Sequence, residues 1–161
     1  MTDTIIDRIF EKDILEKLRG ITTVDAFLND VSVLDGFLIH YVKDLHEGAD
    51  GLSFPCVAAQ FSDDLVEAKS DGSLQGVISR TVKLIGAVSV TDRSIVNRKL
   101  NTLVFDVRKT LAYDKFNATA KRNTEAKSIE VGGCRFDLPD NTDQYAYFEM
   151  TITINYVENW K

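Results

Sequence analysis

The most constraining feature of the sequence is a strict alternation of side chains at residues 146–156. The sequence there reads AYFEMTITINY, and every second residue, from Ala146 through Phe148 to Tyr156, is apolar or aromatic. A period of two over about eleven residues, rich in β-branched and aromatic types, predicts a long β-strand with one buried face. Such a strand needs neighbours in a sheet and a layer packed over its apolar side. The rest of the chain must supply both.

Residues 2–19 predict an amphipathic helix, because apolar side chains recur there at helical spacing. Thr2 or Thr4 is the expected N-cap, and Gly20 suits the position after the helix. Two interpretations remain for residues 21–50. Thr23 is a candidate cap for a short helix, and residues 37–45 fit a strand as well as a second short helix.

Residues 53–90 predict a long β-hairpin with its turn at residues 69–73, which read KSDGS. In the second strand, Gly86 at mid-strand indicates a bend or a close packing contact. Both strands are longer than a hairpin needs, so we expect the tip to project from the body. A projecting tip is either plain surface or an arm that reaches a neighbouring molecule.

A second amphipathic helix is predicted from residue 92 onward, with Thr91 or Asp92 as its cap. We expect this helix to cover the apolar face of the strand at residues 146–156. Its apolar stripe, widened by Ile95 and Val104, comprises Val96, Leu100, Leu103, Val107 and Leu111. The side chains expected to pack together are Leu100, Leu103, Val107 and Leu111 of the helix with Phe148, Met150, Ile152 and Ile154 of the strand.

Residues 128–137 predict two short strands around a turn or bulge at Gly132 and Gly133. Together the segments predict an α+β fold, a mostly antiparallel sheet with a long hairpin and two main helices packed on one face. No repeat, linker or low-complexity segment divides the chain. Its 161 residues with 44% hydrophobic content suit a single domain over residues 1–161.

The sequence contains no recognisable catalytic constellation. His40 and His46 are six positions apart, and no Cys/His cluster of zinc spacing accompanies them. A metal site of His46, Glu47 and Asp50 can be drawn, but a solvated loop is the better interpretation. No phosphate-binding loop, dinucleotide motif or nucleophile elbow occurs. We therefore expect no enzyme, no metal and no cofactor.

Two cysteines, Cys56 and Cys134, are expected to be free buried thiols, because no export signal is apparent. No stretch approaches the ~20 apolar residues of a membrane span. We therefore expect a cytosolic chain without a membrane partner.

The charge of the chain is unevenly distributed. Residues 1–71 contain 15 acids and 6 bases, whereas residues 92–127 contain 9 bases and 4 acids. The net charge of −6 argues against direct, sequence-specific binding of nucleic acid. Two explanations of the asymmetry remain, namely a mixed solvated surface, or complementary patches that meet when copies of the chain associate.

The order of the predicted elements resembles the tail terminator family of long-tailed bacteriophages, the proteins similar to minor tail protein U. The likeness is one of architecture and extends over nearly the whole chain. It is carried by a strand that runs straight into a helix, SRTVKLIGAVSVTDRSIVNRKLNTLVFDVRKTLA, and by the closing strand, AYFEMTITINYVENW.

The resemblance implies a small α+β subunit that forms a ring, expected to be a hexamer. The ring would cap the tail tube, end tail polymerisation and offer a surface to the head–tail connector. It implies a place in the virion, at the head-proximal end of the tail, after assembly in the host cytoplasm, and it brings no catalytic residues. The alternatives are another phage neck or tail-completion protein, a small-ligand binding module with a pocket between sheet and helices, and an enzyme of unrecognised type.

A closed ring uses contacts between two different surfaces of the subunit. We expect the acidic hairpin of one subunit to contact the basic helix face of its neighbour. Exposed ion pairs contribute only about 0–1 kcal/mol each, so Leu65, Val66 and Leu74 are expected to add apolar contact. The expected interface residues are Asp63, Asp64, Glu67 and Asp71 on the hairpin, with Arg93, Arg98, Arg108, Lys109, Lys121 and Arg122 on the helix and the loop after it.

Overall fold

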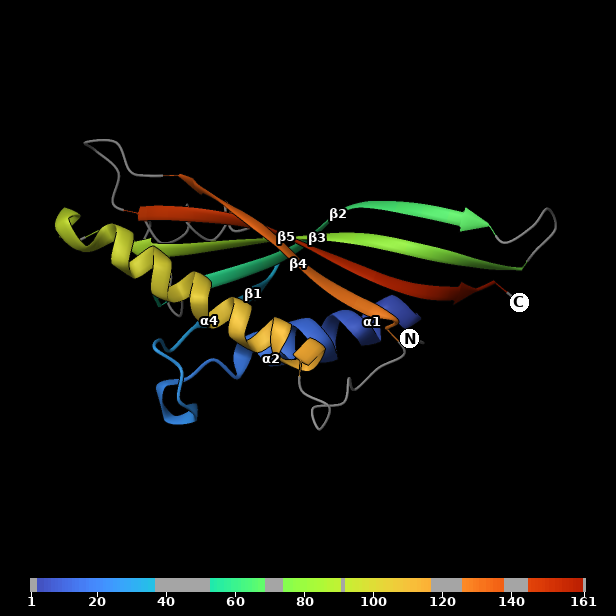
Figure 1. The fold of residues 1–161 in the computed structure, drawn as a ribbon, viewed down its shortest axis with the longest axis horizontal. Coiled ribbons are helices and arrows are strands. Elements are labelled where there is room, and N and C mark those ends of the chain that lie inside the picture. Colours follow the sequence, from blue (N-terminus) through green and yellow to red (C-terminus); the bar gives the residue numbers. More distant parts are fainter. Residues whose placement is uncertain are drawn as a thin grey trace.

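A five-stranded sheet in the order β1-β2-β3-β5-β4 forms the centre of the computed structural model, which describes residues 3–36, 53–68, 74–90, 92–116, 126–137 and 145–160. The pair β1–β2 is parallel and the other pairs are antiparallel. The helices lie together on one side of the sheet (Figure 1). The α+β single-domain fold with a long hairpin is therefore confirmed. The strands are β1 (Ser32–Asp35), β2 (Cys56–Ala68), β3 (Gln75–Ser89), β4 (Ser128–Asp137) and β5 (Tyr145–Asn159).

The alternating strand of the sequence is β5, and it lies between β3 and β4 in the sheet. Its apolar positions all face the helices and have no exposed surface, while the intervening positions lie on the opposite face. Both of its edges are paired, to β3 along its whole length and to β4 over most of it. A strand with two neighbours and a covered face buries the apolar area that its period of two predicts.

The N-terminal helix is continuous through α1 (Ile5–Ile9), the π-helical segment η1 (Phe10–Leu15) and α2 (Glu16–Arg19). Of the two predicted caps, Thr4 is the one used. Its hydroxyl accepts the backbone N–H of Asp7 at 3.3 Å, and the Asp7 carboxylate accepts the Thr4 N–H at 2.9 Å. Gly20 follows the helix as the C-cap, with a right-handed φ of −76°.

Thr22, and not Thr23, caps the next element, which is a single 3₁₀ turn, η2 (Thr23–Asp25). The expected short helix is therefore wrong. Ala26 ends the turn in the left-handed conformation at φ 66°, and the side chain of Val24 is 92% exposed. Val24 is therefore not part of an apolar face that a longer helix would bury. The proposed strand or helix at residues 37–45 lies outside the described residues.

The second predicted helix is α4 (Val96–Phe116), preceded by the 3₁₀ turn η3 (Arg93–Ile95). Asp92 is the cap of η3, because the Asp92 carboxylate accepts the N–H of Ser94 at 3.0 Å. The predicted stripe is buried and shares one core cluster with the four predicted positions of β5. Val104 widens the stripe as expected. Ile95 does not, because it lies in η3 and remains 36% exposed.

Glycines allow a close side-chain contact at one place in the sheet and a bulge at another. Gly86 pairs with Phe148, and a Cβ at residue 86 would overlap the Phe148 ring, so the predicted close contact is confirmed. β4 is one strand and not the two predicted, with a register shift between Val131 and Cys134. The glycine pair between them forms a bulge, which was one of the two alternatives.

Candidate interaction surfaces

The ends of β2, β3 and β5 extend beyond the helices on the right of Figure 1. We call this part the arm and define it as residues 61–68, 74–80 and 154–160. β5 runs beside the hairpin in the arm, with Val66 paired to Ile78 and Ile78 paired to Tyr156. Because three strands extend together, the arm is a continuation of the sheet and not an isolated hairpin.

Arg80 joins the arm to the N-terminal helix. Its guanidinium donates to Asp64 Oδ2 at 3.3 Å and lies 4.9 Å from the centroid of the Phe61 ring. The Phe61 ring packs in turn on Phe10 of η1, with 4.7 Å between centroids. Among the residues that the structure describes, the buried Nε of Arg80 has no hydrogen-bond partner. These contacts fix the base of the arm on the body of the subunit.

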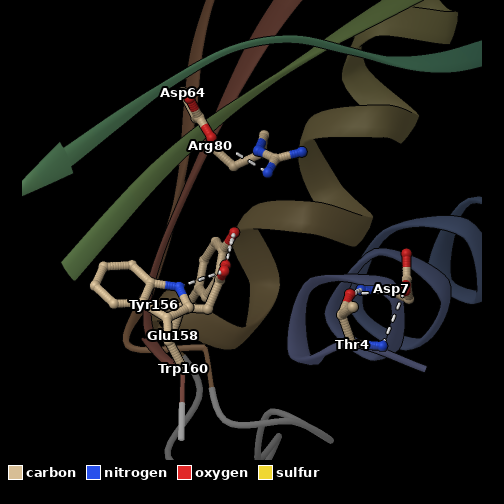
Figure 2. A network of polar contacts seen from close by, with 7 residues as sticks. All are labelled: Thr4, Asp7, Asp64, Arg80, Tyr156, Glu158 and Trp160. Carbon is tan, nitrogen blue, oxygen red and sulfur yellow. Dashed lines mark hydrogen bonds and ion pairs between the residues drawn. The ribbon is translucent and has the colours of Figure 1, made fainter. Parts of the chain in front are cut away.

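Glu158 organises the outer end of the arm, as Figure 2 shows. It accepts from the indole Nε1 of Trp160 at 2.8 Å and from the hydroxyl of Tyr156 at 3.3 Å. The backbone N–H of Trp160 donates to the carbonyl of Leu74 at 2.8 Å, and its ring covers Gly76. Burial raises the pKa of Tyr156 to about 12, so the phenol remains a donor to Glu158 at neutral pH.

The helix-facing side of the arm presents large apolar side chains to solvent. Phe61, Val66 and Trp160 are 40–49% exposed, and Leu74 beside Trp160 is 52% exposed. We call these four residues the arm surface. Phe61 lies at the base of the arm opposite Val82, and Val66, Leu74 and Trp160 follow toward its outer end. Exposed apolar groups of this kind mark interaction sites in soluble proteins. Of the acidic residues near them, Glu158 binds Tyr156 and Trp160, Asp64 is paired with Arg80, and Asp7 of α1 interacts with the charge of Arg80. Hydrogen bonds from Thr4 lower the pKa of Asp7 and so favour its negative form.

The outer face of α4 presents one large apolar residue among bases. Phe105 is 55% exposed, although its neighbours Val104 and Asp106 are buried. On a helix, residues three, four and seven positions away lie on the same face. For Phe105 these include Arg98, Asn101 and Arg108, which are all exposed. The sequence interpretation missed Phe105, and its position outside the apolar stripe was the available signal.

Asp106 holds a further apolar residue next to this face. Its carboxylate, fully buried, accepts the backbone N–H groups of Leu28 and Asn29 at 3.1 and 2.9 Å and the Asn29 side-chain amide at 2.8 Å. Leu28 is thereby fixed beside α4, with its side chain 59% exposed. We call Leu28, Arg98, Asn101, Phe105 and Arg108 the helix surface.

The structure divides the predicted interface residues into two groups. Asp63 and Glu67 on β2 and Arg98 and Arg108 on α4 are exposed, as an interface role requires. Asp64 and Lys109 instead serve the subunit itself. Asp64 binds Arg80, and Lys109 donates to the carbonyl of Ala26 at 3.0 Å and lies 4.8 Å from the Phe27 ring centroid.

Arg93 lies in η3, and its side chain is not described. Asp71, Lys121 and Arg122 lie outside the described residues, as do His40 and His46. Within the described ranges, no group of three or more His, Cys, Asp or Glu residues is arranged to hold a metal ion. In the same ranges, no helix is long and apolar enough to cross a membrane.

Both cysteines are free thiols, as predicted. Cys56 is fully buried on the sheet face away from the helices, where it packs with Ala58 and Ala87. Burial raises the pKa of Cys56 to about 12, which makes it a packing residue and not a nucleophile at neutral pH. Cys134 is only half-buried, so the prediction of two buried thiols holds fully for Cys56 alone.

A cavity of about 260 Å³ lies on the sheet face away from the helices. It is not the pocket between sheet and helices that a ligand-binding module was expected to have. It is also smaller than the roughly 300–1,000 Å³ typical of small-molecule sites. The lining residues are Ile85, Arg135, Asp137, Tyr147, Phe148 and Glu149.

Comparison with known proteins finds no matching protein-family model and no matching curated protein. The functional argument therefore rests on the two surfaces, which present apolar side chains in surroundings of opposite charge.

Proposed function

We propose that this protein is a structural component of a phage virion that caps the tail tube as a ring, expected to be a hexamer. The ring ends polymerisation of the tube and then provides the surface to which the head–tail connector joins. Its partners in this role are copies of itself, the tail tube protein and the connector. The role is one of occlusion and docking, so it involves no reaction and no cofactor.

The observation that carries the proposal is the arm. In an isolated subunit, a sheet that extends past its helices is unfavourable, because it leaves four large apolar side chains exposed to water. In a ring these residues have a place to be buried, because each subunit has a neighbour at a fixed position. The resemblance in element order to the tail terminators supports the same role.

Heterologous contacts support a ring more specifically than a dimer. The arm surface and the helix surface differ in shape and charge, and a contact between two different surfaces generates a ring when the rotation closes. A ring also explains how one small chain can stop a tube. A ring with the symmetry of the tube contacts every subunit at the end of the tube at once, so no site for further addition remains.

The test is removal of the protein during phage assembly. Particles made without it are expected to contain tails of uncontrolled length or tails that fail to join heads, as seen by electron microscopy. Supplying the wild-type chain in trans should restore uniform tails. His40→Ala and His46→Ala should restore them equally, provided that both fold. Uniform tails joined to heads in the absence of the protein would refute the capping role.

A further inference from the structure

We propose that the arm surface of one chain binds the helix surface of a second copy, with Phe105 at the centre of the contact. The inference rests on the proposed ring and names the contact through which it closes. The sequence already placed Val66 and Leu74 in this contact, and the structure adds the aromatic residues Phe61, Phe105 and Trp160, which neither charge nor periodicity identifies.

The apolar parts of the two surfaces fit the composition of interface cores. Aromatic residues and Arg are enriched in the centres of protein interfaces, and a few such residues provide most of the binding energy. The arm surface supplies Trp160 and Phe61, and the helix surface supplies Phe105 between Arg98 and Arg108. Trp160 is held in place for this role, because Glu158 binds its indole N–H and Leu74 binds its backbone N–H. An anchored aromatic side chain loses little conformational entropy on binding.

The charges select a second copy as the occupant and fix its orientation. Asp63 is exposed in the β2 bulge at the base of the arm and Glu158 lies beside Trp160 at its outer end, whereas the helix surface includes Arg98 and Arg108. Contact between unlike surfaces therefore brings opposite charges together. Contact between two arms, or between two α4 faces, would bring like charges together. Both surfaces are exposed in the single chain, so they do not bind each other within one subunit.

The experiment is a complementation test with two variants that each lack one surface. Val66→Asp with Leu74→Asp removes the arm surface and leaves α4 intact, while Phe105→Asp removes the helix surface and leaves the arm intact. All three residues are exposed, so both variants are expected to fold, which circular dichroism and thermal melting verify. Sedimentation velocity then measures the association of the wild-type chain, of each variant alone, and of the equimolar mixture.

We expect the wild-type chain to self-associate and each variant alone to lose about thirtyfold or more in affinity. The mixture should form a one-to-one dimer and nothing larger, because one intact surface remains on each chain and only one contact is possible. A second helix-side variant, Arg98→Glu with Arg108→Glu, should behave as Phe105→Asp does. The matched control is Phe136→Ser, an exposed aromatic outside both surfaces, which should leave association unchanged.

Self-association of either variant alone at the wild-type affinity would overturn the contact, since it would mean pairing of like surfaces. A mixture that stays monomeric, or a wild-type chain that stays monomeric up to the millimolar range, would overturn it as well. The proposed function and the contact are refuted by different results. Association through these surfaces without any effect on tail length would refute capping alone, and normal capping by the arm variant would refute the contact alone.

Discussion

The carboxylate of Asp106 accepts the backbone N–H of Asn29 at 2.9 Å, a bond between residues 77 positions apart. The same carboxylate accepts the N–H of Leu28 at 3.1 Å. One buried side chain of α4 thus fixes the segment that follows η2, and with it the exposed side chain of Leu28. The shape of the helix surface depends on this bond.

Asp106→Ala should destabilise the fold and release this segment. It leaves the N–H groups of Leu28 and Asn29 without an acceptor, at a cost of about 1–3 kcal/mol for each group left unsatisfied. Hydrogen exchange at these two amides should become faster, and by more than exchange in the sheet does. Asp106→Asn should have a smaller effect. Asn101→Ala, on the exposed face of the same helix, is the control and should change neither. Unaltered exchange at Asn29 would show that the carboxylate does not hold the segment.

Leu103→Ala and Ile152→Ala should each lower the free energy of unfolding by roughly 2–5 kcal/mol. Both side chains are fully buried in the core between α4 and β5, so truncation leaves a cavity. Urea denaturation with matched m-values measures the loss. Thr151→Ala is exposed on the same strand and should cost far less. Melting temperatures equal to that of the wild type would mean that α4 does not cover β5.

Stability at high pH should fall because of Tyr156. Burial raises its folded-state pKa to about 12, above the unfolded value of about 10. A raised pKa contributes stability that is complete below about pH 10 and is lost as the pH rises through about 12. Tyr156→Phe should weaken the decline in urea midpoint between pH 9 and pH 11, and Tyr145→Phe is the control. An equally steep decline in Tyr156→Phe would assign the effect to other groups.

Reversing the exposed charges should weaken self-association, and reversing both sets should restore it. Asp63→Lys alters the arm, and Arg98→Glu with Arg108→Glu alters the helix surface. Asp64 and Lys109 are left unchanged, because their charges bind Arg80 and Ala26 within the subunit. Wild-type association should also decrease with added salt. If neither reversal changes the affinity or its salt dependence, the charges do not contribute to the contact.

The long regular elements were predictable from the sequence because their signals are local. The period of two in β5 and the stripe of α4 each repeat over many residues, and the side chains that repeat are the ones that the fold buries. Asp92 and Thr4 cap their helices through neighbours two or three positions away, so a short window of sequence contains the interaction. The hairpin follows from two such runs in succession.

The short elements and the surfaces were not predictable in this way. The 3₁₀ turn at η2 has the residues of a helix start. Its end depends on Ala26 in a left-handed conformation, on the hydrogen bond that Asp106 accepts from Leu28, and on the one that Lys109 donates to Ala26. Likewise, no sequence pattern distinguishes Asp64, which Arg80 neutralises, from Asp63 beside it.

The sequence by itself determined the long strands β2, β3 and β5 and the apolar faces of α4 and β5, because periodicity is a property of neighbouring residues. It did not predict β1, and it predicted β4 as two strands. Only the tertiary structure decided that Phe61, Val66, Leu74 and Trp160 lie on one side of an extended arm, and that Asp106 holds Leu28 beside α4. Those placements depend on strand register and on hydrogen bonds between residues far apart in the chain, whose energies arise only when the whole domain has packed.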